Sequence, residues 1–284
     1  MNFLIPITPN IVVNTLGIER SGNFGAIRLN DCIVVIDSGA SPKIGTKFRK
    51  ELKSKFKQEI KYVILTHTHT DHRNGLASFS DIPIIMSSKS LNNMPTTFKR
   101  KNFNIITFEN RYTIGKEEEK IEIFHGGGHT IGSSYIYFPK EKALFSGDLL
   151  FLGNVNYNIP FFGFYQNKPK RTGNPEEAIK ALEHIIDLNV DILIPGHGKH
   201  TFNPQYELAQ QLSFLKTLRS SIKKKLQDSK NLDSLKLSDF DLIRQAYDQI
   251  ESEPKTKKHK DHIWLENYLN WLKKSFYNYY NQEN

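Results

Sequence analysis

The sequence contains one cysteine, Cys32, among 284 residues. No disulfide can therefore form within the chain, which excludes a small fold held together by disulfides. Cys32 lies in the apolar run from Cys32 to Ile36, where a buried core thiol is more common than a reactive one. We expect a structural cysteine.

A sustained apolar stretch is lacking at the amino terminus. Residues 1–6 contain neither a basic region nor a long apolar run, so neither a secretory signal nor a membrane anchor is apparent. We therefore expect a cytoplasmic protein with no membrane partner. The hydrophobic content of 38% in 284 residues allows one sizeable core plus an appended segment.

The pattern of apolar residues predicts alternating strands and helices over the first 200 residues. Strands are expected near 11–16, 24–36, 61–65, 83–86, 104–107, 112–125, 134–138 and 143–146, with a further strand ending at Ile194. Helices are expected near 43–57 and 175–188. This order fits an α+β fold in which two sheets are faced by helices, a four-layer αββα sandwich.

Four side chains that can bind metal lie within the six residues 67–72, His-Thr-His-Thr-Asp-His. The apolar run 62–65 comes directly before them and indicates a buried strand. The cluster is then presented at the carboxyl end of that strand, where sites in α/β proteins are common.

The spacing within this cluster indicates where its side chains point. In an extended segment His67 and His69 face the same side, so one metal ion could take both imidazoles. If a helix follows through residues 73–77, Asp71 and His72 would face a neighbouring point, and a second ion could bind there. A loop of solvated histidines is the alternative, which four ligands together disfavour.

Three more candidate ligands lie farther along the chain: His129, Asp148 and His197. Each follows an apolar strand-like run, at 121–124, 143–145 and 192–194, and each has a glycine directly before it. Glycine allows tight turns and close backbone approach, as a ligand loop requires.

At these residues the chain resembles the metallo-β-lactamase-fold superfamily of metallohydrolases. The five motifs of that superfamily appear in order if Asp37, in the segment 35–39, is counted as the first, and the match spans roughly residues 10 to 200. The joint pattern is highly specific for the fold and the metal site, whereas substrate choice varies widely among such relatives.

The resemblance implies the roles of the site residues. It places one metal ion on His67, His69 and His129, a second on Asp71, His72 and His197, and Asp148 between them. It also implies a hydroxide that bridges the ions as the nucleophile, because coordination lowers the pKa of water from about 16 to about 7. Asp71 and Asp148 are thus the expected catalytic carboxylates, with Asp71 also handling a proton.

Zinc is the expected metal, two ions per chain, although iron or manganese would also suit imidazole and carboxylate ligands. Asp37 is expected to stand behind the ligands and orient a ligand loop, with a purely structural turn as the alternative.

The resemblance also bears on the substrate. True β-lactamases of this fold usually lack a carboxylate at the position of Asp148, so its presence argues against antibiotic hydrolysis. The pattern looks more like the glyoxalase-II-like and lactonase-like hydrolases, to which the segment 174–182 is also similar. They cleave acyl bonds, and we expect a small-molecule thioester, lactone or other ester or amide here.

After Pro204 the sequence becomes helical, with helices expected at 208–226, 237–250 and 263–276. We divide the chain into a catalytic domain, 1–203, and a helical C-terminal extension, 204–284. In glyoxalase-like relatives such a region helps form the substrate cleft. Here it would do the same, or else pack on the sandwich or make a homodimer contact.

A loop after Asp148 is rich in aromatic and cationic residues, and loops beside a metal commonly contact substrate. Tyr157, Tyr165, Lys168 and Arg171 are our candidates for substrate contacts. The aromatic rings would wall an apolar pocket and the cations would hold a carboxylate or phosphate. Ordinary packing and solvated charge explain them nearly as well.

The net charge of +9 raises an alternative function. A basic surface attracts phosphate backbones, so a metal-dependent phosphodiesterase or nuclease is the alternative, with nucleic acid as its partner. The charge is diffuse, since residues 204–284 have 14 Lys or Arg against 11 Asp or Glu. A mononuclear iron persulfide dioxygenase is a third candidate, which the seven ligand positions disfavour.

Overall fold

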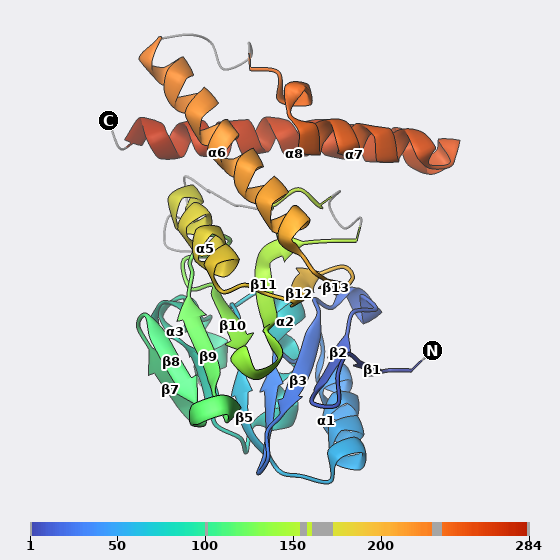
Figure 1. The fold of residues 1–284 in the computed structure, drawn as a ribbon, viewed down its shortest axis with the longest axis vertical. Helices are drawn as coiled ribbons and strands as arrows, with labels where there is room; N and C mark the ends of the chain where they lie inside the picture. Colours follow the sequence, from blue (N-terminus) through green and yellow to red (C-terminus); the bar gives the residue numbers. More distant parts are fainter. Residues whose placement is uncertain (1, 100–101, 154–157, 161–172, 229–234, 283–284) are drawn as a thin grey trace.

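The computed structural model describes residues 2–99, 102–153, 158–160, 173–228 and 235–282, which form two sheets with helices around them (Figure 1). The first sheet runs in chain order: β1 (Ile5–Pro6), β2 (Ile11–Asn14), β3 (Phe24–Arg28), β4 (Ile33–Ile36), β5 (Ile60–Ile64), β6 (Ile84–Ser87) and β7 (Ile105–Phe108). The second is ordered β13 (Thr201–Phe202), β12 (Ile192–His197), β11 (Ala143–Phe151), β10 (Ser134–Phe138), β9 (Ile121–His125) and β8 (Arg111–Ile114).

Parallel pairs in each sheet bring distant parts of the chain to one edge. In the first sheet β4 to β7 are parallel, and in the second β11 is parallel to β12. The other pairs are antiparallel. Because parallel neighbours end on the same side, the residues that follow β4 and β5 lie together, as do the residues at the ends of β11 and β12.

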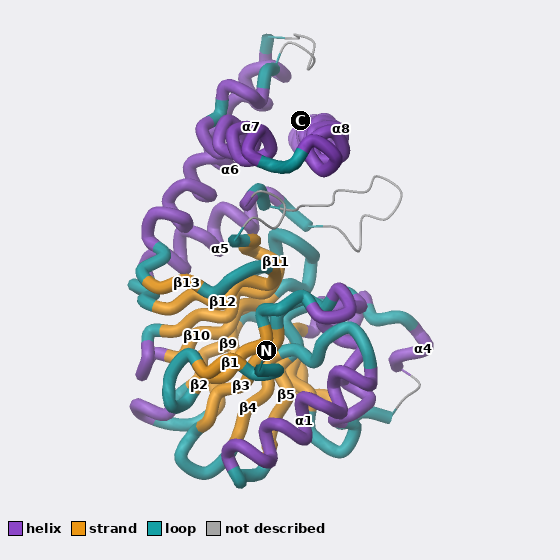
Figure 2. The backbone as a smooth tube through the Cα atoms, turned by 90° about the vertical axis from the view of Figure 1, so that its right-hand side faces the viewer, coloured by secondary structure: helices purple, strands orange, loops and turns teal. Residues whose placement is uncertain are grey.

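The strand residues alternate between two apolar cores. Val35 faces an outer core of the first sheet, whereas its neighbours Val34 and Ile36 pack in a second core against Ile136 and Phe145 of the other sheet. This alternation follows from the period of two in a strand. In Figure 2 the strands lie in the middle of the molecule, with α1 on one side and α6 on the other. The expected α+β sandwich of αββα layers is confirmed.

Helix α1 (Pro42–Phe56) covers the outer face of the first sheet. Ser41 caps it by accepting a hydrogen bond from the amide of Ile44, and Pro42 occupies its first turn, where a missing N–H costs nothing. Phe48 and Leu52 are fully buried, and the Phe48 ring lies 4.7 Å from that of Phe24. The shorter helices α2 (Thr70–Arg73), η2 (Asn74–Phe79), α3 (Ser88–Asn93) and α4 (Thr96–Lys99) belong to the same half.

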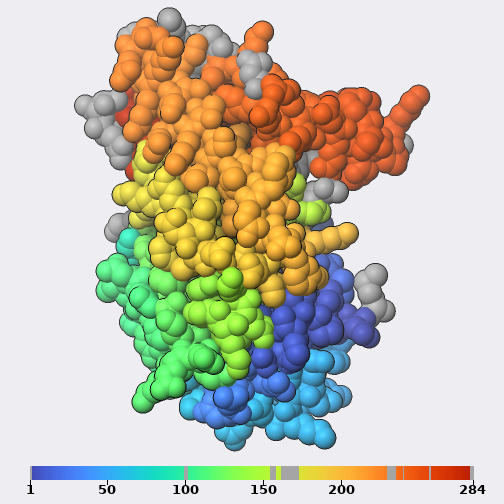
Figure 3. Space-filling view, viewed as in Figure 1, coloured from blue at the N-terminus to red at the C-terminus, as the bar shows by residue number. Residues whose placement is uncertain are grey.

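Four longer helices belong to the second half of the chain: α5 (Pro175–Asp187), α6 (Gln205–Gln227), α7 (Asp241–Ser252) and α8 (Lys255–Gln282). Helix α5 packs against α6, and α7 and α8 lie across α6 beyond the end of the sandwich (Figure 1). One apolar core joins them to the sheet, from Leu144 of β11 through Leu182 of α5 and Leu218 of α6 to Leu272 of α8. The C-terminal helices therefore continue the body of the sandwich (Figures 1 and 3). The division at residues 203 and 204 falls directly before α6 and stays a prediction.

Several elements differ from the expected bounds. The run 112–125 is two strands, because Gly115, with a φ of 79°, and the short helix η3 (Glu117–Glu119) reverse the chain between β8 and β9. Likewise, 24–36 is the hairpin β3–β4. The last helix begins eight residues earlier than expected and ends later, since its polar ends extend beyond the apolar pattern.

Cys32 is buried, as expected, and its burial and the neighbouring Asp31 raise the pKa of its thiol to about 11. Among the helices of the described residues, none is both long and apolar enough to cross a membrane.

Candidate metal centre

The seven candidate ligands come from four strands and the segments that follow them. His67 and His69 lie in the loop after β5, and α2 then holds Asp71 and His72. His129 follows β9 and a three-glycine turn, Asp148 is within β11, and His197 ends β12. The structure brings all seven together in two groups, and within each group the ligand atoms lie within 4.8 Å of one another.

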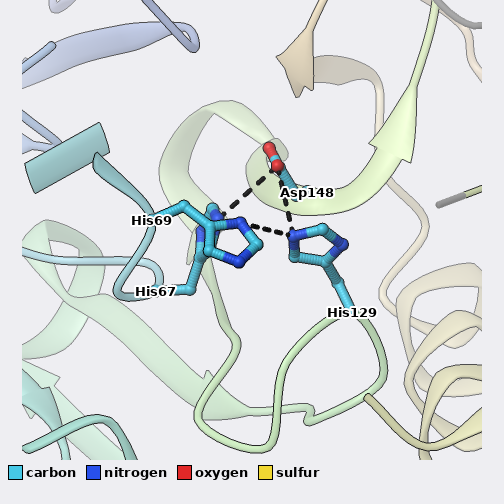
Figure 4. A group of neighbouring side chains, drawn as sticks. All are labelled: His67, His69, His129 and Asp148. Carbon is cyan, nitrogen blue, oxygen red and sulfur yellow. Dashed lines mark hydrogen bonds and ion pairs between the residues drawn. The ribbon is translucent and has the colours of Figure 1, made fainter. Parts of the chain in front are cut away.

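The first group consists of His67, His69, His129 and Asp148 (Figure 4). Nε2 of His129 lies 3.0 Å from Nδ1 of His69 and 3.3 Å from Oδ2 of Asp148. Nε2 of His67 lies 3.5 Å from the same carboxylate oxygen. Three imidazoles and one carboxylate oxygen therefore converge on one point.

The second group consists of Asp71, His72, His197 and, again, Asp148. Here the other oxygen of Asp148, Oδ1, lies 3.0 Å from Nε2 of His72 and 3.5 Å from Nε2 of His197. Oδ2 of Asp71 lies 3.1 Å from Nε2 of His197. Asp148 thus presents one oxygen to each group, so one carboxylate can serve two neighbouring cations.

Asp37 stands behind the second group. It follows β4 with a φ of 57°, and its Oδ2 lies 2.8 Å from Nδ1 of His72. Its carboxylate also accepts hydrogen bonds from the amide and the hydroxyl of Thr66, both at 2.8 Å. A carboxylate at Nδ1 holds the proton of His72 there and leaves the lone pair of Nε2 for a cation.

Thr66, which the sequence analysis missed, orients His67 in the same way. Its hydroxyl has one hydrogen, which it donates to Asp37, and it lies 3.0 Å from Nδ1 of His67. The oxygen must then accept from Nδ1–H, so that Nε2 of His67 is also unprotonated. Only the position of Thr66 between Asp37 and His67 reveals this role, because a threonine at a strand end is common.

Backbone packing fixes the opposite side of the site. Asn23, before β3, donates from its Nδ2 to the carbonyls of Pro195 and Gly198, both at 2.8 Å, and thereby holds the loop of His197. Gly22 lies so close to the ring of His72 that a Cβ there would overlap it. Neither residue has a sequence signal, since each acts through a contact across the fold.

The charges of the site are arranged to accept cations. Burial, together with neighbouring histidines, lowers the pKa values of His67 and His69 to about 4, so both are neutral at pH 7. Burial would also lower the pKa of His197, but Asp148 and Asp71 raise it to about 9. Similarly, burial opposes protonation of His72, yet Asp148 and Asp37 raise its pKa well above the usual value.

The two carboxylates are held ionised. Burial would raise the pKa of Asp71, but the hydrogen bond from His197 and the charge of His72 lower it to about 2. Burial likewise opposes ionisation of Asp148, and three surrounding histidines hold its pKa well below the ordinary value. Without metal, protons on His72 and His197 balance the negative charges of these two carboxylates.

The residues fit divalent metal ions. Nε2 of His67, Nε2 of His72 and Oδ1 of Asp148 are buried, and none makes a hydrogen bond with any residue that the structure describes. Buried polar atoms are nearly always paired, so three orphaned atoms that converge point to a cation. Nitrogen and carboxylate oxygen suit zinc, iron or manganese alike, and the ligand types do not select among them.

The candidate substrate residues Tyr157, Tyr165, Lys168 and Arg171 lie outside the described residues. Of the same segment, Phe151 is described: it is buried, and its ring stacks on that of His197 with the centroids 5.2 Å apart.

The chain is similar to known proteins in both sequence and fold. A profile of the metallo-beta-lactamase superfamily matches residues 17–197. The chain is 28% identical over 176 residues to metallo-beta-lactamase type 2 of Elizabethkingia meningoseptica, covering 55% of this chain and 70% of that protein. It is 24% identical over 214 residues to 2,4-dinitroanisole O-demethylase subunit alpha of Nocardioides sp. (strain JS1661), covering 69% of this chain but only 57% of that subunit.

A solved metallo-beta-lactamase from Pontibacter korlensis has the same fold, with a TM-score of 0.59 at 19% sequence identity. The similarity covers 75% of this chain and 98% of that one.

Proposed function

Because the chain belongs to the metallo-beta-lactamase superfamily of hydrolases, we propose that it cleaves an acyl bond with two divalent metal ions. One ion is held by His67, His69 and His129, the other by Asp71, His72 and His197, and Asp148 lies between them. The observation that carries the proposal is the position of Asp148, whose two oxygens face different groups. We propose zinc, with iron or manganese as metals that the ligands would also accept.

When bound, the ions supply Lewis acidity and ionise a water at neutral pH, so that no side chain has to act as the nucleophile. The chain's own residues hold the geometry: Asp37 and Thr66 aim the imidazoles, and Asp148 stays ionised between the two groups. Asp71 differs from Asp148 in access, since its side chain is 27% exposed against 4%. We therefore propose that Asp71 takes a proton from water and then passes it to the leaving group.

An acyl substrate is supported by two considerations. A β-lactam is a cyclic amide, and the similarity to a metallo-beta-lactamase supports the proposal of acyl cleavage. The carboxylate at Asp148 argues for a thioester, lactone or other ester or amide over a β-lactam, as in glyoxalase-like and lactonase-like hydrolases. An iron persulfide dioxygenase needs one metal and would leave one of the two groups without a role. The cytoplasmic location and a homodimer stay predictions.

The test is hydrolysis by the zinc-loaded protein of a matched panel: a thioester, a lactone, a β-lactam and a phosphodiester. Asp148→Ala is the control, and we expect it to lower both metal content and turnover. The loss should exceed the roughly 10- to 100-fold that removal of a residue behind the ligands costs. Asp148-dependent cleavage of the phosphodiester alone would replace the acyl reaction with the nuclease alternative, and full activity of Asp148→Ala would refute the mechanism.

A further inference from the structure

A cavity of about 340 Å³ opens beside the candidate metal centre, on the side of His69 and Asp71. Its wall comes from residues 68–71 and Arg73, from Ser90 and Asn93 of α3, from Pro95, and from residues 130–132. Ligand pockets in proteins range from about 300 to 1,000 Å³, so this one suits a small organic group. Because His69 and Asp71 belong to different ligand groups, a substrate bound between them would place a substituent in this cavity.

Arg73 brings a positive charge to the cavity wall. It is half-buried, and its Nε donates a hydrogen bond of 2.7 Å to the carbonyl of Thr68, which fixes the plane of the guanidinium. As far as the chain is described, neither Nη1 nor Nη2 has a hydrogen-bond or ion-pair partner. A guanidinium whose Nη atoms have no partner in the described chain can donate hydrogen bonds to an anionic ligand.

Other partly buried arginines show what is missing at Arg73. Arg49, whose side chain is 24% exposed, pairs with Asp81 at 2.6 Å. Arg219, 29% exposed, pairs with Glu176 at 3.0 Å. In both, a carboxylate of the chain itself completes the guanidinium. Arg73 has no such carboxylate among the described residues, and it lines the cavity.

We propose that Arg73 binds a carboxylate on the acyl portion of the substrate. With Nε held by Thr68, the two Nη atoms remain for an end-on contact with both oxygens of a carboxylate, a geometry that the guanidinium fork favours. Thr68 and Thr70 also line the cavity, and a threonine hydroxyl can add a donor. The substrate class is then an acyl compound that carries a second, anionic carboxylate, and this assignment rests on the proposed hydrolytic function.

The test compares dicarboxylates with monocarboxylates of equal length as mimics of the acid that hydrolysis would release. Succinate, glutarate and adipate are titrated against butyrate, pentanoate and hexanoate by calorimetry on the zinc-loaded protein. The inference requires that one carboxylate of each acid binds at the metal centre and that only the second carboxylate of a dicarboxylate contacts Arg73. We expect at least one dicarboxylate to bind about 10- to 100-fold more tightly than the monocarboxylate of equal length, because a charge-assisted hydrogen bond contributes that much binding energy.

Arg73→Ala should abolish this preference and leave monocarboxylate binding unchanged. Arg73→Gln is the second variant, because its amide can still donate to the Thr68 carbonyl but carries no charge; it too should lose the preference. Arg111→Ala is the control, because it removes an equal charge from β8. Glu122 then still pairs with Lys120 at 3.3 Å, and the preference for dicarboxylates should remain.

Equal binding of the two acid series, no detectable binding of any dicarboxylate, or a preference that survives in both Arg73 variants would overturn the inference. The readout is binding and needs no turnover. A retained dicarboxylate preference with no acyl hydrolysis would therefore refute the proposed reaction and leave the carboxylate site standing.

Discussion

Replacement of Asp37 by asparagine tests how the ligands are oriented. The Asp37 carboxylate accepts from three donors: the amide of Thr66, its hydroxyl, and Nδ1–H of His72, all at 2.8 Å. Asparagine has one acceptor oxygen and places an NH₂ group against at least one of these donors in either orientation of its amide. Relief of that conflict moves the proton of His72 to Nε2, which then faces Asp148 as a donor and no longer as a ligand.

We expect Asp37→Asn to weaken binding of the second metal ion by roughly 10- to 100-fold, about 1.4 to 2.7 kcal/mol, the usual cost of losing a partner behind a ligand. Metal affinity is measured by competition with a chromophoric chelator. Asp81→Asn is the matched control, because it removes an exposed carboxylate that pairs with Arg49 on the surface. An unchanged metal affinity in a folded Asp37→Asn protein would refute the proposed orientation of His72.

Two further predictions concern protons and packing. At pH 7 the metal-free protein carries protons on His72 and on His197, whose pKa is about 9, while His67 and His69 are neutral. Metal binding must therefore release protons, and the affinity for metal should rise as the pH rises toward 9. Calorimetry of zinc binding in buffers of different ionisation enthalpy checks this, and a binding enthalpy independent of the buffer would contradict it. Leu218 lies in the core shared by α6 and the second sheet, so Leu218→Ala should lower the free energy of unfolding by about 2 to 5 kcal/mol. Unfolding in urea should show a single transition, and separate transitions would show instead that residues 204–284 fold independently.

The sequence predicted the layers of the fold because strand period and apolar pattern agree. Val34, Val35 and Ile36 alternate between two cores as the pattern indicates. The hairpin turns inside 24–36 and 112–125 were not resolved, because polar residues at a turn also fit a half-exposed strand. The packing of the C-terminal helices could not be predicted, because it depends on one core that joins residues far apart in sequence, such as Leu182 and Leu272.

The candidate ligands were found because seven residues follow apolar strand-like runs with a recognisable spacing. The supporting residues were not, with the exception of Asp37. Thr66, Asn23 and Gly22 act through a hydroxyl, two backbone carbonyls and the absence of a Cβ, and none of these has a pattern of its own along the chain. Arg73 is a similar case, because only the folded chain shows that it lines a cavity and that its Nη atoms lack a partner among the described residues.

The number of metal ions per chain is the most direct test of the proposed dinuclear site. Native mass spectrometry of chelator-treated protein, titrated with zinc, should show two bound ions in the wild type and fewer in Asp148→Ala, because both ligand groups share that carboxylate. A wild-type chain that saturates at one ion or binds none, or an Asp148→Ala chain that still holds two, would contradict the dinuclear site.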